Sequence, residues 1–251
     1  MQFWQARRAG RQWLEWRDRP DMEWSRFGER TVVLLTILWL ALQVTAKITP
    51  DPAPKMESLT TNDLLMHFVV SSGMTLMLVA IMLSSQRPAV EFGLNLKSLR
   101  DQVRDGFNGF FLAVLPMAVT IVLTASLSLR TEETQNPLLR LLTETGNPID
   151  VVLVGLLAVV VAPLSEEMMF RVILQGWLTT VVRPGLAILI VVALFAAIHG
   201  LADGLALLPL ATVLGYLFYR RHSYVSVVVI HFLFNATMLV LQLLTQTKKI
   251  P

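Results

Sequence analysis

Long apolar segments separated by short polar ones dominate the chain, and their lengths predict its architecture. Apolar runs of roughly 18 residues or more are long enough to cross a membrane as helices. The hydrophobic units are residues 31–46, 64–85, 107–129, 151–180, 185–199, a segment that follows a Gly-Leu-Ala-Asp-Gly break and ends at Arg220-Arg221, and residues 224–244. This pattern predicts an all-α, polytopic transmembrane bundle of seven helices, or eight if Pro163 divides the fourth unit.

The composition supports a membrane protein. Hydrophobic residues make up 54% of the chain and charged residues 16%, whereas a soluble domain carries about a quarter charged residues. The formal net charge of +3 is small, and nothing in its distribution supports nucleic-acid binding. Cysteine is absent, which excludes disulfides, thiolate metal sites and a cysteine nucleophile.

Residues 1–30 form a basic leader in which seven arginines alternate with tryptophans. Tryptophan rings at the apolar boundary and guanidinium groups among lipid phosphates suit a segment that lies in the headgroup region or the cytoplasm. Residues 31–251 have room for the bundle and almost nothing else. We therefore expect one transmembrane domain after the leader.

The distribution of basic residues predicts the topology. The positive-inside rule places the leader, the 86–105 loop and the Arg220-Arg221 turn in the cytoplasm. The more acidic 130–150 loop then lies outside. With seven crossings, Lys248 and Lys249 also fall outside, against the rule; an eighth, half-length element at Pro163 would remove this conflict.

Ionisable side chains inside the apolar spans are the candidates for function. Each costs on the order of 2.5–3.5 kcal/mol at the membrane centre on insertion scales. They occur in three places: Glu166-Glu167 with Arg171, His199 four residues after Phe195, and His231 four residues before Asn235. His67, in the second span, has no partner in the sequence pattern and is interpreted as a packing or lumen-facing residue.

Helical spacing relates the members of each group. Glu167 and Arg171 share a face and can form an ion pair, while Glu166, about 100° around the helix, points elsewhere. His231 and Asn235 present an imidazole and an amide on one face.

Two features affect how these groups meet. Pro163 is expected to kink or restart the fourth helix, with Ser165 as a cap for the new segment. The predicted spans put His199 near the outer end of its helix and His231 nearer the inner end. At 1.5 Å per residue the two histidines are about 10 Å apart in depth, a separation that short, tilted or broken helices would close.

These residue types suggest water activation. A carboxylate in a partly dry cavity can act as a general base, and histidines opposite it can stabilise an oxyanion, protonate a leaving amine or ligate a metal. Two glutamates and two histidines also form a plausible divalent-metal set. The chain has no His-Glu-x-x-His signature, so the residue types leave metal-free and metal-dependent catalysis equally open.

The three groups also carry a resemblance. "EEMMFR", "FAAIH" and "HFLFN" resemble, in order, the EExxxR, FxxxH and HxxxN/D motifs of the CAAX-protease and bacteriocin-processing (CPBP/Abi) family of intramembrane endopeptidases. The similarity covers about residues 160–240, and the motif core is predicted at about 150–244.

The resemblance implies a role for each residue. Glu166 would be the base that activates water, supported by the pair Glu167 and Arg171, with Glu167 as a candidate to share the base role. His199 would hold the water, and His231 with Asn235 would stabilise the oxyanion. The family has been described both as metal-free glutamate proteases and as metalloproteases. We favour the glutamate mechanism without a cofactor; the rival is zinc bound by Glu166, His199 and His231.

The sequence therefore predicts an intramembrane endopeptidase of a bacterial plasma membrane, with a cytoplasmic N-terminus. Its substrates would be membrane-associated peptides or proteins, such as prenylated C-termini or leader peptides. Two alternatives belong to other classes: a non-catalytic membrane scaffold or immunity protein that keeps the polar cluster for packing, and, less favoured, a proton-coupled transporter.

Overall fold

Helices account for nearly all of the described chain. The computed structural model describes Trp24 and residues 26–48, 60–127 and 147–247. The helical units are α2 (Phe27–Ile48), α3 (Thr61–Leu83), α4 (Leu99–Ser126), a kinked helix over residues 148–181, α9 (Pro184–Ile198), α10 (Leu201–Arg221) and α11 (Tyr224–Thr247), with a short 3₁₀ turn, η1 (Ala89–Phe92), before α4. The predicted all-α bundle is confirmed. Six units are long and apolar enough to cross a membrane, and α9 is shorter.

The kinked helix is a continuous run of α-helical and π-helical segments. Its parts are α6 (Pro148–Leu156), η3 (Leu157–Val161), α7 (Ala162–Glu167), η4 (Met168–Gln175) and α8 (Gly176–Val181), of which η3 and η4 are π-helical. The predicted break at the Glu166 motif is confirmed as a kink.

The predicted restart with Ser165 as its cap is wrong. The Ser165 hydroxyl donates backward to the carbonyls of Val161 (2.9 Å) and Ala162 (3.0 Å), and α7 has no side-chain cap. The π register accommodates Pro163 without ending the helix. Pro163 therefore adds no eighth span.

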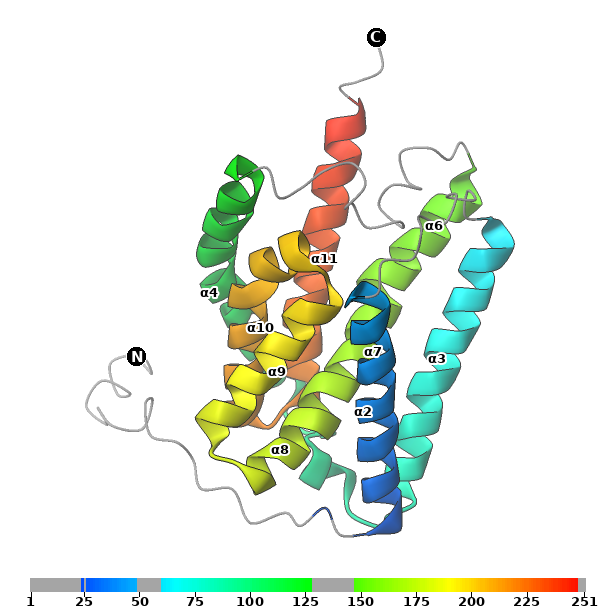
Figure 1. The fold of residues 1–251 in the computed structure, drawn as a ribbon, viewed down its shortest axis with the longest axis vertical. Coiled ribbons are helices and arrows are strands. Elements are labelled where there is room, and N and C mark those ends of the chain that lie inside the picture. Colours follow the sequence, from blue (N-terminus) through cyan, green and yellow to red (C-terminus); the bar gives the residue numbers. More distant parts are fainter. Residues whose placement is uncertain (1–23, 25, 49–59, 128–146, 248–251) are drawn as a thin grey trace, which may run out of the picture.

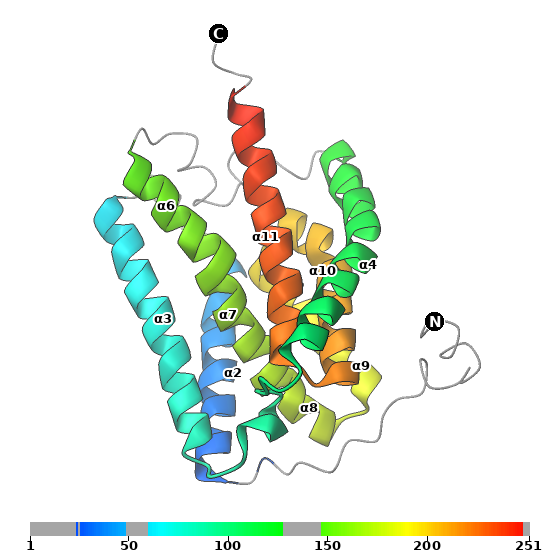
Figure 2. The same cartoon turned by 180° about the vertical axis from the view of Figure 1, so that it is seen from behind.

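The helices run alternately between two ends of an elongated bundle. α2 begins at the end that also holds the turns between α3 and α4, α8 and α9, and α10 and α11, whereas α11 finishes at the opposite end (Figure 1). Viewed from behind, α4 and α11 lie side by side and α6 lies between α11 and α3 (Figure 2). α2 and α3 pack against each other, and each also contacts the kinked helix.

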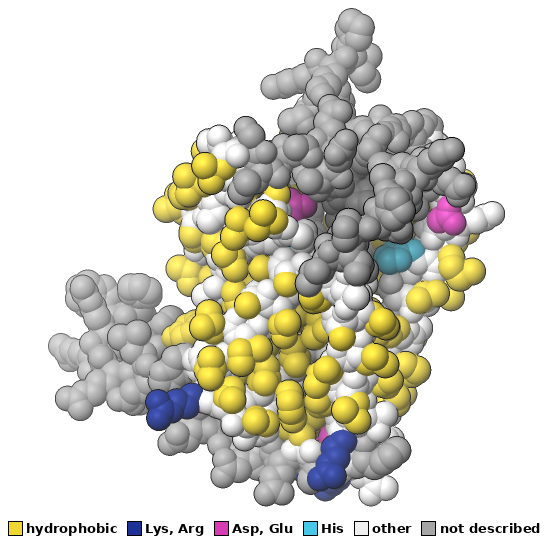
Figure 3. Space-filling view, viewed as in Figure 1, with side chains coloured by type: hydrophobic (Ala, Val, Ile, Leu, Met, Phe, Trp, Pro, Cys, Tyr) yellow, Lys and Arg dark blue, Asp and Glu magenta, His cyan; other side chains and the backbone are white. Residues whose placement is uncertain are grey.

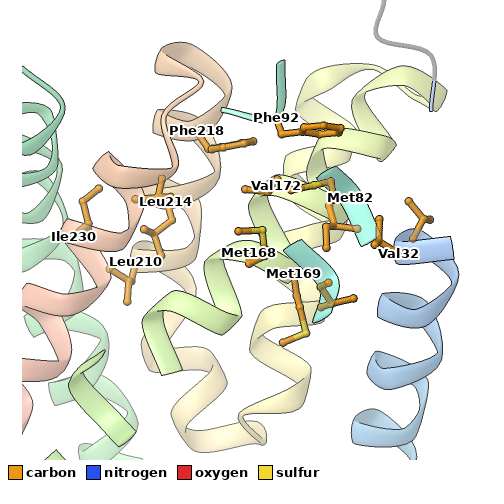
Figure 4. Close-up of a cluster of buried hydrophobic side chains, with 14 of the residues drawn as sticks. Val32, Met82, Phe92, Met168, Met169, Val172, Leu210, Leu214, Phe218 and Ile230 are labelled. Carbon is orange, nitrogen blue, oxygen red and sulfur yellow. The ribbon is translucent and has the colours of Figure 1, made fainter. Parts of the chain in front are cut away.

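The π-helical segment η4 lies at the centre of the bundle. All eight of its residues are buried. Met168, Met169 and Val172 pack in a cluster with Val32 of α2 and Leu210 of α10 (Figure 4). The wider π-helix thus places its side chains in contact with several helices, and this packing fixes the adjoining segment α7, which carries Glu166.

The flank of the molecule is apolar and its ends are charged (Figure 3). Arg87 and Arg221 belong to the end where α2 begins, and Asp63 and Asp150 to the opposite end. This pattern and the six apolar helices indicate an integral membrane protein. The cytoplasmic location of the end that carries Arg87 and Arg221 stays a prediction. Most of the 1–30 leader, most of the 130–150 loop, and Lys248 and Lys249 lie outside the described residues.

Candidate active site

Glu166 faces two histidines that come from other helices. Its Oε2 atom lies 3.8 Å from Nε2 of His199, the residue that ends α9, and 4.0 Å from Nε2 of His231 in α11. The Glu166 and His199 side chains are about one-fifth exposed, whereas His231 is buried. Three residues that are far apart in the sequence thus meet at one carboxylate oxygen.

The short helix α9 closes the predicted separation in depth between the histidines. With 15 residues it extends about 22 Å, so it ends inside the bundle and leaves His199 level with Glu166. Gly200 then turns the chain with φ of 79°, a conformation that favours glycine. Gly204 packs so closely that a Cβ there would clash with the Ala196 carbonyl oxygen. This tight turn between α9 and α10 fixes the position of His199.

The hydrogen bonds of the two imidazoles determine which nitrogen faces Glu166. His199 Nδ1 lies 2.7 Å from the Phe195 carbonyl oxygen, and His231 Nδ1 lies 2.8 Å from Glu167 Oε1. Both partners are acceptors, so each Nδ1 carries a hydrogen and donates it. In the neutral rings, both Nε2 lone pairs therefore point toward Glu166, where they can accept hydrogen bonds from water or coordinate a cation.

Glu167 and Arg171 form a fully buried pair behind His231. Arg171 Nε lies 3.2 Å from Glu167 Oε2, and neither side chain is exposed. Glu167 thus engages His231 with one oxygen and Arg171 with the other. Both of its oxygens therefore face protein groups.

The ring of Phe195 contacts all of the cationic and imidazole groups of the site. Its centroid lies 4.5 Å from that of His199 and 6.0 Å from that of His231. The Arg171 guanidinium carbon is 5.1 Å from the same centroid, within the range of a cation–π contact. Phe195 thus contacts both histidines and accepts the His199 hydrogen bond through its carbonyl.

Asn235 is bonded to the kinked helix. Its Nδ2 donates to the Ala158 carbonyl oxygen at 2.7 Å. In the π register of η3, Ala162 N–H bonds the carbonyl five residues earlier, that of Leu157. The next bond in this register would join Ala158 to residue 163, which is a proline and has no N–H. Asn235 replaces the missing donor, so one of its two N–H groups stabilises the kink that precedes Glu166.

Replacing Asn235 with alanine is expected to lower the free energy of unfolding by about 1–3 kcal/mol, because the Ala158 carbonyl loses its partner. In a Pro163→Ala background, where residue 163 regains an N–H, the loss should be smaller by about 1 kcal/mol. Thr237→Ala is a matched control, since that hydroxyl bonds only to its own helix. Equal losses in both backgrounds, measured by denaturation in micelles, would contradict the assignment.

A cavity of about 230 Å³ lies between the kinked helix and the pair α2–α3. Glu166 and His199 line one wall, with Ser165 and Met169, while the facing wall comes from Trp39, Gln43, His67, Ser71, Met74 and Thr75. The cavity has room for several waters. Of the polar residues on this facing wall, only His67 stood out in the sequence, as a histidine without a partner in its span. The available signal was the four-residue spacing of His67, Ser71 and Thr75 in an apolar helix.

The donor types at Glu166 suit zinc, but their spacing is wide. Two imidazole nitrogens and a carboxylate form a common zinc ligand set, and bonds of about 2.0–2.1 Å would separate two ligand atoms by about 3.3 Å. The Glu166–histidine distances of 3.8 and 4.0 Å exceed this. Within the described residues, no three His, Asp or Glu side chains are grouped closely enough to hold a metal ion.

Part of the chain matches a known protein family. Residues 148–237 match the family described as type II CAAX prenyl endopeptidase, Rce1-like. This segment runs from the kinked helix into α11 and contains Glu166, Glu167, Arg171, His199, His231 and Asn235. No curated protein matches the chain, and no solved structure does.

Proposed function

Because residues 148–237 form a domain of the Rce1-like type II CAAX prenyl endopeptidase family, we propose that this protein is an intramembrane endopeptidase in which Glu166 activates the attacking water. The observation that carries the proposal is the position of Glu166 Oε2, within 4.0 Å of both histidine Nε2 atoms and on the wall of a cavity. Residues 31–251 would act as one transmembrane domain, with the motif core at about 150–244.

In this mechanism each group of the site has one task. A water donates one hydrogen bond to Glu166 Oε2 and the other to His199 Nε2. Glu166 takes a proton as the water oxygen attacks the peptide carbonyl carbon. His231, whose Nδ1 is held by Glu167, turns Nε2 toward the oxyanion and stabilises it when that nitrogen carries a hydrogen. The C–N bond then breaks, and Glu166 delivers the proton to the leaving amine. Water supplies both the hydroxyl group and the proton, so the step balances.

The reaction favours an extended substrate. In an α-helix the N–H and C=O groups of a peptide bond are engaged in intrahelical hydrogen bonds and covered by neighbouring side chains. The scissile segment would therefore bind unwound, as the C-terminal tail of a prenylated protein can. Leader peptides of membrane-associated proteins are the second substrate class that meets this requirement.

Removal of metal tests the mechanism. We expect the purified protein to keep its turnover number after treatment with EDTA and dialysis, and to contain less than stoichiometric zinc by elemental analysis. A bound zinc would instead polarise the substrate carbonyl and lower the pKa of its water. Stoichiometric zinc whose removal stops hydrolysis, and whose return restores it, would assign Glu166, His199 and His231 as ligands and overturn the metal-free mechanism.

A further inference from the structure

The cavity wall opposite Glu166 carries a polar stripe inside an apolar span. His67, Ser71 and Thr75 follow one another at intervals of four residues, so they share a face of α3. Gln43 extends this polar surface from α2. Both helices lie outside the residues matched by the family, 148–237.

The polar groups of this wall are available to bind a ligand. The Thr75 hydroxyl donates to the Ser71 carbonyl at 2.9 Å. Within the described chain, the Gln43 amide, the His67 imidazole and the Ser71 hydroxyl have no hydrogen-bond partner. Polar groups at membrane depth are costly when they face lipid, and their position on a cavity wall provides a polar environment instead.

An extended peptide needs such groups. Unlike a helix, it presents unpaired N–H and C=O groups, and leaving each one unpaired at membrane depth costs several kcal/mol. On the Glu166 wall, the Ser165 hydroxyl already bonds its own helix, and Glu166 and His199 take part in the proposed chemistry. Glutamine, serine and histidine side chains can both donate and accept, which suits the alternating groups of an extended backbone.

We infer that Gln43, His67 and Ser71 bind the backbone of the unwound substrate segment and hold it against Glu166. The inference rests on the proposed endopeptidase function. Recognition through the backbone would select substrates by their extended conformation more than by the identity of their side chains. The α2–α3 pair is then the substrate-binding wall, and the family-matched segment is the catalytic wall.

Adjacent serines provide a matched test. Ser71 and Ser72 are both half-buried in α3, but only Ser71 lines the cavity. With a peptide ending in farnesylated Cys-aliphatic-aliphatic-X as the probe, Ser71→Ala should raise KM about 3–10-fold, with kcat within about twofold. Ser72→Ala should change neither constant. Thermal unfolding of both variants checks that the fold is retained.

Crosslinking tests the contact without turnover. A photoreactive residue is placed at position 71 or 72 of the Glu166→Gln variant, and the same peptide is added. Crosslinks from position 71 and not from 72 would support the inference. Equal kinetics for the two alanine variants, or crosslinks from position 72 alone, would overturn it. Failure of the proposed function gives a different result, since Glu166→Gln would then hydrolyse the peptide as wild type does. If the wild-type protein does not hydrolyse the peptide, the crosslinks from positions 71 and 72 alone decide whether the α2–α3 wall binds it.

Discussion

Replacing Glu166 with glutamine is expected to lower peptide hydrolysis by about 10²–10⁴-fold, the contribution typical of a general base. The amide keeps the shape of the side chain but cannot accept the proton from water. Since the Glu166 side chain is partly exposed to the cavity, the variant should insert and unfold as wild type does. The measurement is initial-rate hydrolysis by reconstituted protein, with thermal unfolding in parallel.

Glu91→Gln is the matched control for this experiment. Glu91 is an exposed carboxylate in η1 that pairs with Arg87 and does not line the cavity. Its replacement should leave hydrolysis unchanged. Full activity of Glu166→Gln would remove Glu166 from the mechanism, and activity lost only together with folding would favour a scaffold. Comparison of membrane-protein termini in cells with wild type and Glu166→Gln would identify the substrates.

Replacing Arg171 with leucine should give the largest loss of stability. Arg171 and Glu167 are both fully buried, so the substitution leaves a carboxylate without its cation. Breaking a buried pair in this way costs about 3–5 kcal/mol. The Arg104–Asp101 pair is the surface control: it has the same charges but is largely exposed, and Arg104→Leu should cost less than about 1 kcal/mol.

The double variant Glu167→Gln/Arg171→Leu separates stability from function. Without a buried charge it should regain most of the lost stability, because replacing an entire buried pair is often neutral. Its activity should stay low, since His231 then faces a neutral amide in place of the carboxylate that holds its Nδ1–H. Recovery of wild-type activity in the double variant would contradict a positioning role for Glu167.

The sequence could predict the helices and the candidate polar residues because unpaired backbone groups and charged side chains both cost free energy in contact with lipid. Apolar length located the seven units, although α4 begins at Leu99, eight residues before the predicted 107. Its first turns are polar and extend beyond the apolar run, so hydropathy alone does not detect them.

The details that depend on register could not be predicted. The partner of Asn235 follows from the π-helical bonds around Pro163, and local periodicity does not distinguish a π turn from a broken helix. The wall formed by Gln43 and His67 depends on how α2 and α3 pack against a helix about 100 residues later in the chain. Spacing within one segment carries no information about such packing.

The short helix α9 creates a local hydrophobic mismatch. Its 15 residues extend about 22 Å, against a hydrocarbon core of about 30 Å. Where a protein is shorter than the bilayer, the lipid thins beside it or polar groups reach inward. The mismatch is confined to one side of this molecule, because the other six helical units are long enough to cross. If Glu166 activates water as proposed, hydrolysis by the reconstituted protein should therefore vary with the thickness of the surrounding membrane.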